Sequence, residues 1–251
     1  MRTNSILQEM IYRRKSTRAY TKVPADAETI AKITEQLATI EPLYPEIKTR
    51  FEIVGRDKVR SMFRWFPEQA VAAFSEEREG YLENIGYILA RLDLYLHSIG
   101  LGTCWIGMGR MSDASVMDMG EDKFVILLAF GYPESGTPYR ERDEFNRKPL
   151  DEISDYPDTR LEPVRLAPSS INSQPWYITH GEGGALHIYR TADNLLRAKV
   201  MARFNTIDMG IAIAHLAVSL GESFRFERLS SPPSEKGRVY LGTVYTDLQD
   251  N

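Results

Sequence analysis

A basic cluster near the N-terminus has the residue types that hold a phosphate group. The stretch "RRKSTRAY", residues 13–20, supplies four basic side chains within six residues, together with a serine hydroxyl. Phosphate is held best by charge-assisted and bidentate hydrogen bonds, which guanidinium, ammonium and hydroxyl groups donate. The residues concerned are Arg14, Lys15, Ser16 and Arg18. A solvated helix end, with basic residues favoured by the helix dipole, would have the same composition, and composition alone favours that second interpretation.

A polar loop in the second half of the chain has the residue types of a ligand-binding segment. The stretch "LAPSSINSQPWYI", residues 166–178, carries two prolines that restrict the backbone on either side of several hydroxyl and amide groups. Such a loop suits the polar edge of a heteroaromatic ring. The alternative is a helix-to-strand connection whose serines and asparagines only satisfy their own backbone.

Composition limits the classes of function. The 251 residues suffice for one large or two small domains, and 43% of them are hydrophobic, which suits a substantial core. A net charge of -4 and a pI near 5.7 give no overall basic field for nucleic acid or an anionic membrane. The single cysteine, Cys104, excludes an intramolecular disulfide, and neither a signal peptide nor a membrane-spanning run is visible. We therefore expect a cytoplasmic protein.

Periodicity predicts the elements that must position the cluster and the loop. Apolar residues at helical spacing predict helices over residues 5–14, 27–37 and 81–99, the last of which ends at a glycine. Short apolar runs predict strands over 50–55 and 124–130. Residues 60–77 are predicted to form a helix or a lid, and residues 146–157 a surface linker.

Two parts of the sequence indicate an internal repeat. "IGYILARLDLYL" from Ile85 and "MGIAIAHLAVSL" from Met209 share four residues in twelve at one offset of 124 residues, and Gly86 falls opposite Gly210. "RFEIVG" and "WYITHG" show a similar offset of 126 residues. Any two amphipathic helices align moderately well, but the similar spacing of strand and helix in both halves favours a duplicated unit.

These motifs resemble those of the FMN-dependent nitroreductase family. The resemblance rests on "RRKSTRAY", "LGTCWIG", "FGYPE…RKPLDEI" and above all "PSSINSQPW". The motif order differs from that of an ordinary member, in which the P-S-S loop follows the arginine cluster after one helix. Here that position holds "IEPLYPEIKTRFEI", which lacks the polar elements of the loop, and the second half in turn lacks the cluster.

Members of the family are homodimers in which each subunit supplies the cluster to one flavin site and the loop to the other. The resemblance therefore implies a fused pseudo-dimer, of the kind first seen in a thermophilic bacterium, with one complete site. It implies an α+β chain of three-layer α-β-α, nitroreductase-like fold, built from two divergent repeats, 1–150 and 151–251. We expect a monomer, with further self-association left open.

The resemblance also assigns candidate cofactor-binding residues. Arg14, Lys15, Ser16, Arg18 and Arg147 match phosphate and ribityl positions, and the backbone of Ile106 and Gly107 matches the segment that faces flavin N5. The loop over the flavin is matched by Pro168, Ser169, Ser170, Asn172 and Gln174. The pyrimidine-edge contacts have no clear match between residues 60 and 77, and no determinant for NAD(P)H phosphate is visible.

The implied activity is reduction of nitroaromatic, quinone or similar small-molecule acceptors by NAD(P)H through FMN, in ping-pong hydride transfer. No residue is assigned as an acid or base. The alternative is a flavin-binding protein with little turnover, a carrier, a sensor or a degenerate remnant. The four histidines show no metal-ligand spacing, so no metal is expected.

Overall fold

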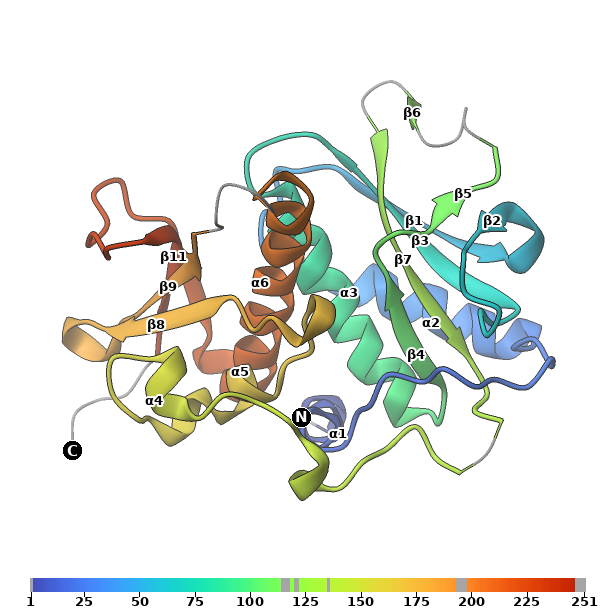
Figure 1. Ribbon diagram of the computed structural model, residues 1–251, viewed down its shortest axis with the longest axis horizontal. Helices are drawn as coiled ribbons and strands as arrows, with labels where there is room; N and C mark the ends of the chain where they lie inside the picture. Colours follow the sequence, from blue (N-terminus) through green and yellow to red (C-terminus); the bar gives the residue numbers. More distant parts are fainter. Residues whose placement is uncertain (1, 114–117, 120–121, 135, 193–197, 247–251) are drawn as a thin grey trace.

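The computed structural model describes residues 2–113, 118–119, 122–134, 136–192 and 198–246 (Figure 1). Its helices are α1 (Arg2–Ile11), α2 (Ala27–Thr39), α3 (Tyr81–Ser98), α4 (Leu150–Ile153), α5 (Glu162–Leu166) and α6 (Ala198–Leu220). The three long helices predicted from periodicity are therefore present, with ends shifted by at most a few residues. The sequence predicts α3 best, because a wide apolar stripe precedes Gly100, whose φ of +82° suits a glycine at a helix end.

Two antiparallel sheets accompany the helices. The first has the strand order β1-β3-β7-β4, with β6 also paired to β7, and the second has the order β10-β11-β9-β8. The strands of the first sheet are β1 (Thr49–Gly55), β3 (Gln69–Glu76), β4 (Gly102–Ile106), β6 (Asp118–Met119) and β7 (Asp122–Gly131). Those of the second are β8 (Trp176–His180), β9 (Leu186–Thr191), β10 (Arg225–Glu227) and β11 (Arg238–Tyr245). A small ribbon pairs β2 (Val59–Arg60) with β5 (Arg110–Met111). The predicted α+β class is confirmed.

The two sheets have the same connectivity. Along the chain, β1, β3, α3, β4 and β7 are followed by β8, β9, α6, β10 and β11. The spatial orders β1-β3-β7-β4 and β8-β9-β11-β10 place corresponding strands in corresponding positions. This agreement is what a duplicated unit predicts, and the first copy adds the small strands β2, β5 and β6.

The long helices α3 and α6 cross at a pair of glycines. A Cβ added to Gly86 would lie 2.1 Å from the carbonyl oxygen of Ile207, and one added to Gly210 would lie 2.0 Å from that of Glu83. The two contacts are reciprocal at the offset of 124 residues found in the sequence. Such a relation is typical of a two-fold symmetric interface between copies. Only glycine permits these backbones to approach so closely.

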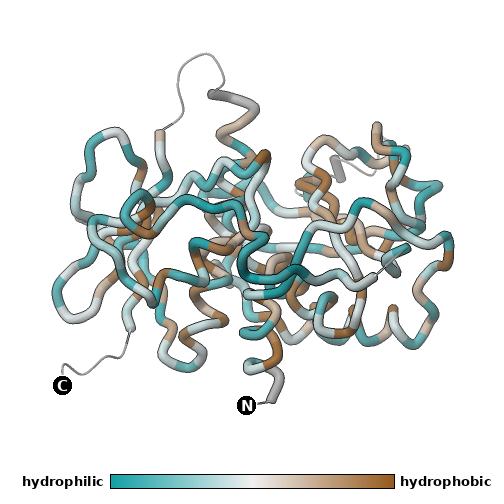
Figure 2. Tube along the Cα trace, turned by 60° about the horizontal axis from the view of Figure 1, so that its bottom comes forward, coloured by the Kyte–Doolittle hydropathy of each residue, from teal (hydrophilic) through white to brown (hydrophobic). Residues whose placement is uncertain are grey.

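The helix pair lies between the two sheets and builds one shared core (Figure 1). Side chains of both halves meet in it, among them Leu89 and Leu92 of α3 and Ile213 and Leu216 of α6. Hydrophobic residues accordingly gather along the central elements, while the outer loops are mostly hydrophilic (Figure 2). The segment Met201–Ser223 is long and apolar enough to cross a membrane by composition, but 72% of its most apolar window is buried inside the protein. That burial is typical of a central core helix.

The prediction of a helix or lid over residues 60–77 is wrong for its second part. Residues 69–76 form β3, which is paired on both edges, with β1 and with β7. Ala70 to Phe74 are all fully buried, because both faces of the strand are covered. A strand buried on both faces shows no alternation of polar and apolar residues, and its alanines favour a helix by intrinsic propensity.

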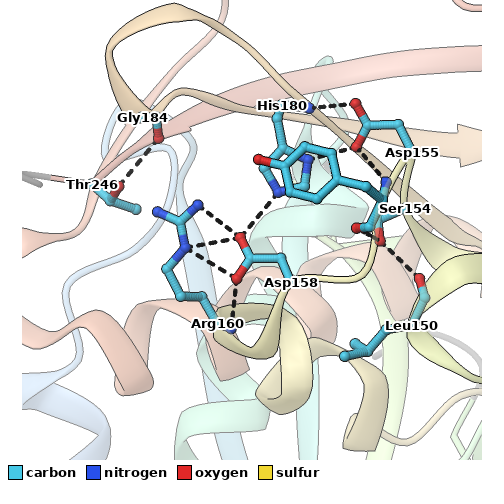
Figure 3. A network of polar contacts seen from close by, with 9 residues as sticks. Leu150, Ser154, Asp155, Asp158, Arg160, His180, Gly184 and Thr246 are labelled. Carbon is cyan, nitrogen blue, oxygen red and sulfur yellow. Dashed lines mark hydrogen bonds and ion pairs between the residues drawn. The ribbon is translucent and has the colours of Figure 1, made fainter. Parts of the chain in front are cut away.

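The expected linker over residues 146–157 includes α4 and is attached to the second sheet. His180 of β8 contacts Asp155 through Nδ1 and Asp158 through Nε2, at 2.5 and 3.0 Å (Figure 3). Asp158 is also paired with Arg160, and the Tyr156 ring stacks on His180. This polar network anchors the chain where it passes from the first half to the second.

Candidate active site

A largely apolar cavity of about 360 Å³ lies where the two halves meet. It is lined by residues of the N-terminal segment, of the end of β4, of the loop before β8 and of α6. The lining residues are Ser16, Arg18, Phe63, Cys104, Trp105, Gly107, Met108, Ile126, Pro168, Ser169, Ser170, Ile171, Met201, Phe204, Ile207, Asp208 and Ile211. The basic cluster and the polar loop, about 150 residues apart in sequence, therefore face one cavity.

The basic cluster is fixed by backbone pairing on both sides. The Thr17 N–H donates to Thr103 O at 2.8 Å, and the Lys15 N–H donates to Pro138 O at 3.1 Å. The first contact pairs the segment with β4 and the second with the chain beyond β7. Ser16 and Arg18 line the cavity from this position, whereas Lys15 does not.

Arg14 is buried beneath the cluster rather than exposed in the cavity. Its side chain is 2% exposed, and its Nε lies 3.2 Å from Asp93 Oδ2 of α3. Asp93 also accepts hydrogen bonds from Thr103 Oγ1 and Trp105 Nε1. Burial alone would raise the pKa of Asp93, but the Arg14 guanidinium and the bonds from His97 and Thr103 hold it well below its usual range. Arg14 therefore acts on the site through its buried positive charge and not through an exposed side chain in the cavity.

Several arginines lie close enough to Arg14 to influence one another's ionisation. Burial, followed by Arg14, Arg140 and Arg165, lowers the pKa of Arg147 to about 10. Burial and the guanidinium groups of Arg14 and Arg18 also lower the pKa of Arg140. Among the residues that the structure describes, the buried Arg140 Nε has no hydrogen-bond partner. An anion at this point would relieve the mutual repulsion and satisfy that donor.

The loop before β8 has an unusual backbone that is held from outside. Ile171, Asn172 and Gln174 have φ values of 48°, 58° and 48°, which are costly for residues other than glycine. Arg147 Nη1 donates to Asn172 Oδ1 at 2.7 Å, and the Lys148 N–H donates to Gln174 Oε1 at 2.8 Å. These contacts turn the two amide side chains toward the linker, and they leave Pro168 to Ile171 along the cavity.

The end of β4 approaches α6 closely at Gly107. A Cβ at this position would lie 2.6 Å from Phe204 Cε1. The glycine thus permits the Phe204 ring to cover the strand end, where backbone groups border the cavity. Ile106 is 1% exposed and packs behind the strand, so only its backbone is available to the site.

The structure separates the sequence-predicted site residues into two groups. The first group lines the cavity and comprises Ser16, Arg18, Gly107, Pro168, Ser169 and Ser170. The second group surrounds or supports it and comprises Arg14, Lys15, Ile106, Arg147, Asn172 and Gln174. Their binding roles remain predictions, but their gathering around one cavity is a property of the fold.

Two residues at the site escaped the sequence analysis. Asp208 of α6 lines the cavity and is 4% exposed. The sequence could have indicated its importance, because it is an acid within the largely apolar run from Ile207 to Ala217. Arg140 lies in the charged stretch "YRERDE", where no feature of the sequence separates it from its neighbours.

The residues present fit FMN. The buried Arg140 Nε without a partner and the repulsion among Arg14, Arg140 and Arg147 suit a dianion such as the terminal phosphate. The aromatic and aliphatic lining of the cavity suits a flat heteroaromatic ring, and its volume lies in the range of small-molecule sites.

Comparisons with known proteins identify the family of the chain. The family model described as "Putative TM nitroreductase" matches residues 6–220. A solved structure described as a "putative nitroreductase", from Thermotoga maritima, has 17% identity and a TM-score of 0.65, over 96% of this chain and 94% of that chain. An FMN-dependent nitroreductase from Clostridium difficile has 15% identity and a TM-score of 0.44, over 55% of this chain and 93% of that one.

A structure described as an NADH oxidase, from Clostridium acetobutylicum, has 15% identity and a TM-score of 0.45, over 57% of this chain and 96% of that one. Among curated proteins, no sequence matches the chain. The match of the family model over most of the chain, together with the shared fold, shows that the protein belongs to this nitroreductase family of oxidoreductases.

Proposed function

We propose that the chain is an FMN-dependent oxidoreductase that uses NAD(P)H to reduce nitroaromatic, quinone or similar conjugated acceptors. The observation that carries this proposal is the joint cavity, in which Ser16 and Arg18 of the first half face Pro168 to Ile171 of the second. FMN would supply reversible hydride chemistry, and the protein supplies binding, orientation and electrostatics.

In this proposal the phosphate is held by Arg18, Arg140 and Arg147, with the Ser16 hydroxyl as a further donor. Arg14 adds positive charge from below. Backbone N–H groups near Gly107 border the ring, and the apolar lining excludes water from it.

Exposed apolar side chains at the cavity support a conjugated acceptor. Ile171 is 79% exposed, Met108 68% and Phe63 36%, and all three contribute to the lining. Exposed apolar groups beside a cavity are typical of ligand-binding surfaces. NAD(P)H and the acceptor would use this open side in turn, which gives ping-pong kinetics.

We further propose one flavin per chain and a monomeric pseudo-dimer. The first half has Pro42, Leu43 and Tyr44 at the positions that correspond to Pro168, Ser169 and Ser170. The Tyr44 ring packs edge-on against Phe226, with centroids 5.7 Å apart, and this segment lacks the serine hydroxyl groups that the loop before β8 supplies. A reducing, cytoplasmic setting is part of the proposal, since the single cysteine is a buried thiol.

The test is a visible spectrum of the purified protein after incubation with FMN and removal of the excess. The expected result is a yellow protein with one flavin per chain that oxidises NADH or NADPH when menadione or nitrofurazone is present, and a monomer by light scattering. A colourless protein would overturn the assignment of the cofactor. Two flavins per chain would contradict the single site, and bound flavin with negligible oxidation would refute turnover.

A further inference from the structure

Among the described residues that line the cavity, Asp208 is an acid that the proposed flavin chemistry has not used. Asp208 of α6 lines the cavity together with Pro168 to Ile171 of the loop, and only 4% of it is exposed. The Ser170 N–H donates to its Oδ2 at 2.9 Å. Its neighbours along the same helix, Phe204, Ile207 and Ile211, are apolar and line the same space. A carboxyl group in such surroundings is more stable neutral than ionised.

The internal repeat supplies a natural comparison for this residue. Asn84 of α3 stands 124 residues before Asp208 and performs the same structural task in the first half. The Tyr44 N–H donates to Asn84 Oδ1 at 3.0 Å, and Asn84 Nδ2 donates to Tyr44 O at 3.2 Å. Tyr44 in turn corresponds to Ser170 at the offset of 126 residues.

An amide therefore suffices to attach the loop to the helix, and the acid at position 208 is not required for that attachment. The acid occurs in the copy whose helix face borders the cavity, and the amide occurs in the other copy. We propose that Asp208 is a neutral carboxylic acid in the resting protein and donates the proton that an acceptor needs after it has received a hydride. This inference rests on the proposed function.

The electrostatic setting agrees with that role. Burial raises the pKa of Asp208 to about 8, while hydrogen bonds from Ser170 and Ser173 partly offset the rise. Among the described lining residues, Arg18 and Cys104 are also titratable, and burial raises the pKa of the Cys104 thiol away from neutral pH. A buried carboxyl group with a pKa of about 8 lies near the pH range where general acids are most effective.

The step balances for a quinone. The quinone gains a hydride, two electrons and one proton, from the reduced flavin, which is thereby oxidised, and becomes a hydroquinone anion. The O–H bond of Asp208 then breaks and an O–H bond forms on the anion, so that neutral hydroquinone leaves and a carboxylate remains. The carboxylate regains a proton from water before the next turnover.

The test uses Asp208→Asn, which keeps an oxygen for the Ser170 N–H and reproduces the side chain present at position 84. Single-turnover oxidation of the reduced holoprotein is followed with menadione, which needs a proton, and with ferricyanide, a one-electron acceptor that needs none. We expect the menadione rate to fall at least about 100-fold, in the range for loss of a general acid, and the ferricyanide rate to stay within about two-fold. Equal effects on both acceptors, or no effect on either, would overturn the proposal.

A second readout does not depend on turnover. Infrared difference spectra of the apoprotein between pH 6 and pH 10 should show the carbonyl stretch of a protonated carboxyl group, which ionises near pH 8 and is absent from Asp208→Asn. Asp122→Asn, at a partly exposed carboxylate paired with Arg50, is the control and should retain the band. Absence of the band in the wild-type protein would overturn the inference. A protein that binds no flavin would overturn the proposed function, and the infrared result would still decide the state of Asp208.

Discussion

The ion pair between Arg14 and Asp93 gives the sharpest prediction about stability. Both side chains are at most 2% exposed, and Arg14 Nε lies 3.2 Å from Asp93 Oδ2. At an effective dielectric constant of about 20, charges at this distance attract each other by about 5 kcal/mol before desolvation is counted. Removal of one partner from a buried pair leaves an uncompensated charge and costs about 3–5 kcal/mol. We expect Arg14→Met to lower the free energy of unfolding by this amount at pH 7.

The assay is urea unfolding of the apoprotein, so that cofactor binding does not enter the result. Arg14→Met, Asp93→Asn and the double variant form a thermodynamic cycle. Because the double variant leaves no buried unpaired charge, we expect its loss of stability to be smaller than the summed losses of the single variants by about 2 kcal/mol or more. Additivity within about 0.5 kcal/mol would refute the coupling.

The pH dependence supplies an independent check. In the wild-type protein the pKa of Asp93 lies below its unfolded value, so its contribution to stability is present above the unfolded pKa and is lost as the pH falls. In Arg14→Met we expect the pKa of Asp93 to rise, because burial is then opposed only by the hydrogen bonds and charge of the remaining partners, so that the penalty at pH 7 fades as the pH falls and the carboxyl group takes up a proton. The stability difference between the two proteins should therefore shrink from pH 7 to about pH 4, and a constant difference would contradict this explanation.

Three further predictions follow from single features of the structure. Gly210→Ala places a methyl group 2.0 Å from Glu83 O and should destabilise the protein by about 1–3 kcal/mol in urea unfolding, whereas an unchanged midpoint would refute the close crossing. Arg140→Met should weaken FMN binding roughly 10-fold or more in a fluorescence titration, through loss of a charge-assisted bond, while riboflavin, which lacks the phosphate, binds equally to both proteins. Burial would raise the pKa of Asp158, but hydrogen bonds from Arg160 and His180 lower it. This carboxylate therefore stabilises the folded protein at pH values above the pKa that it has in the unfolded chain, and the stabilisation is lost as the pH falls. Asp158→Asn should accordingly flatten the loss of stability below about pH 4, and an unchanged acid profile would exclude the network as its source.

The long helices could be predicted from the sequence because the spacing of their apolar residues is a local signal. A glycine in each of α3 and α6 and the apolar stripe that follows it recur at one offset, and Gly86 and Gly210 lie at the crossing of the two helices. The strand β3 could not be predicted in the same way. Its residues are buried on both faces, so the burial that determines its structure removes the alternation by which a strand is recognised.

The sequence by itself determined the residue types of the site and their division between two halves. Ser16 and Arg18 on one side and Pro168 to Ser170 on the other were recognisable as a phosphate cluster and a polar loop. Only the tertiary structure decided what each side chain faces. In the structure Arg14 is buried against Asp93, Asn172 accepts a hydrogen bond from Arg147, and Asp208 lines the cavity. The Arg140 Nε is buried without a partner among the described residues.

The physical reason is that charge pairing and burial depend on neighbours that are distant in the chain. Arg14 and Asp93 are separated by most of the first half, and Asp208 meets Ser170 only because α6 packs beside the loop. The type of a residue determines which hydrogen bonds its side chain can donate or accept. The packing of α3 against α6, and of both helices against the two sheets, decides whether that capacity is used within the protein or remains available to a ligand.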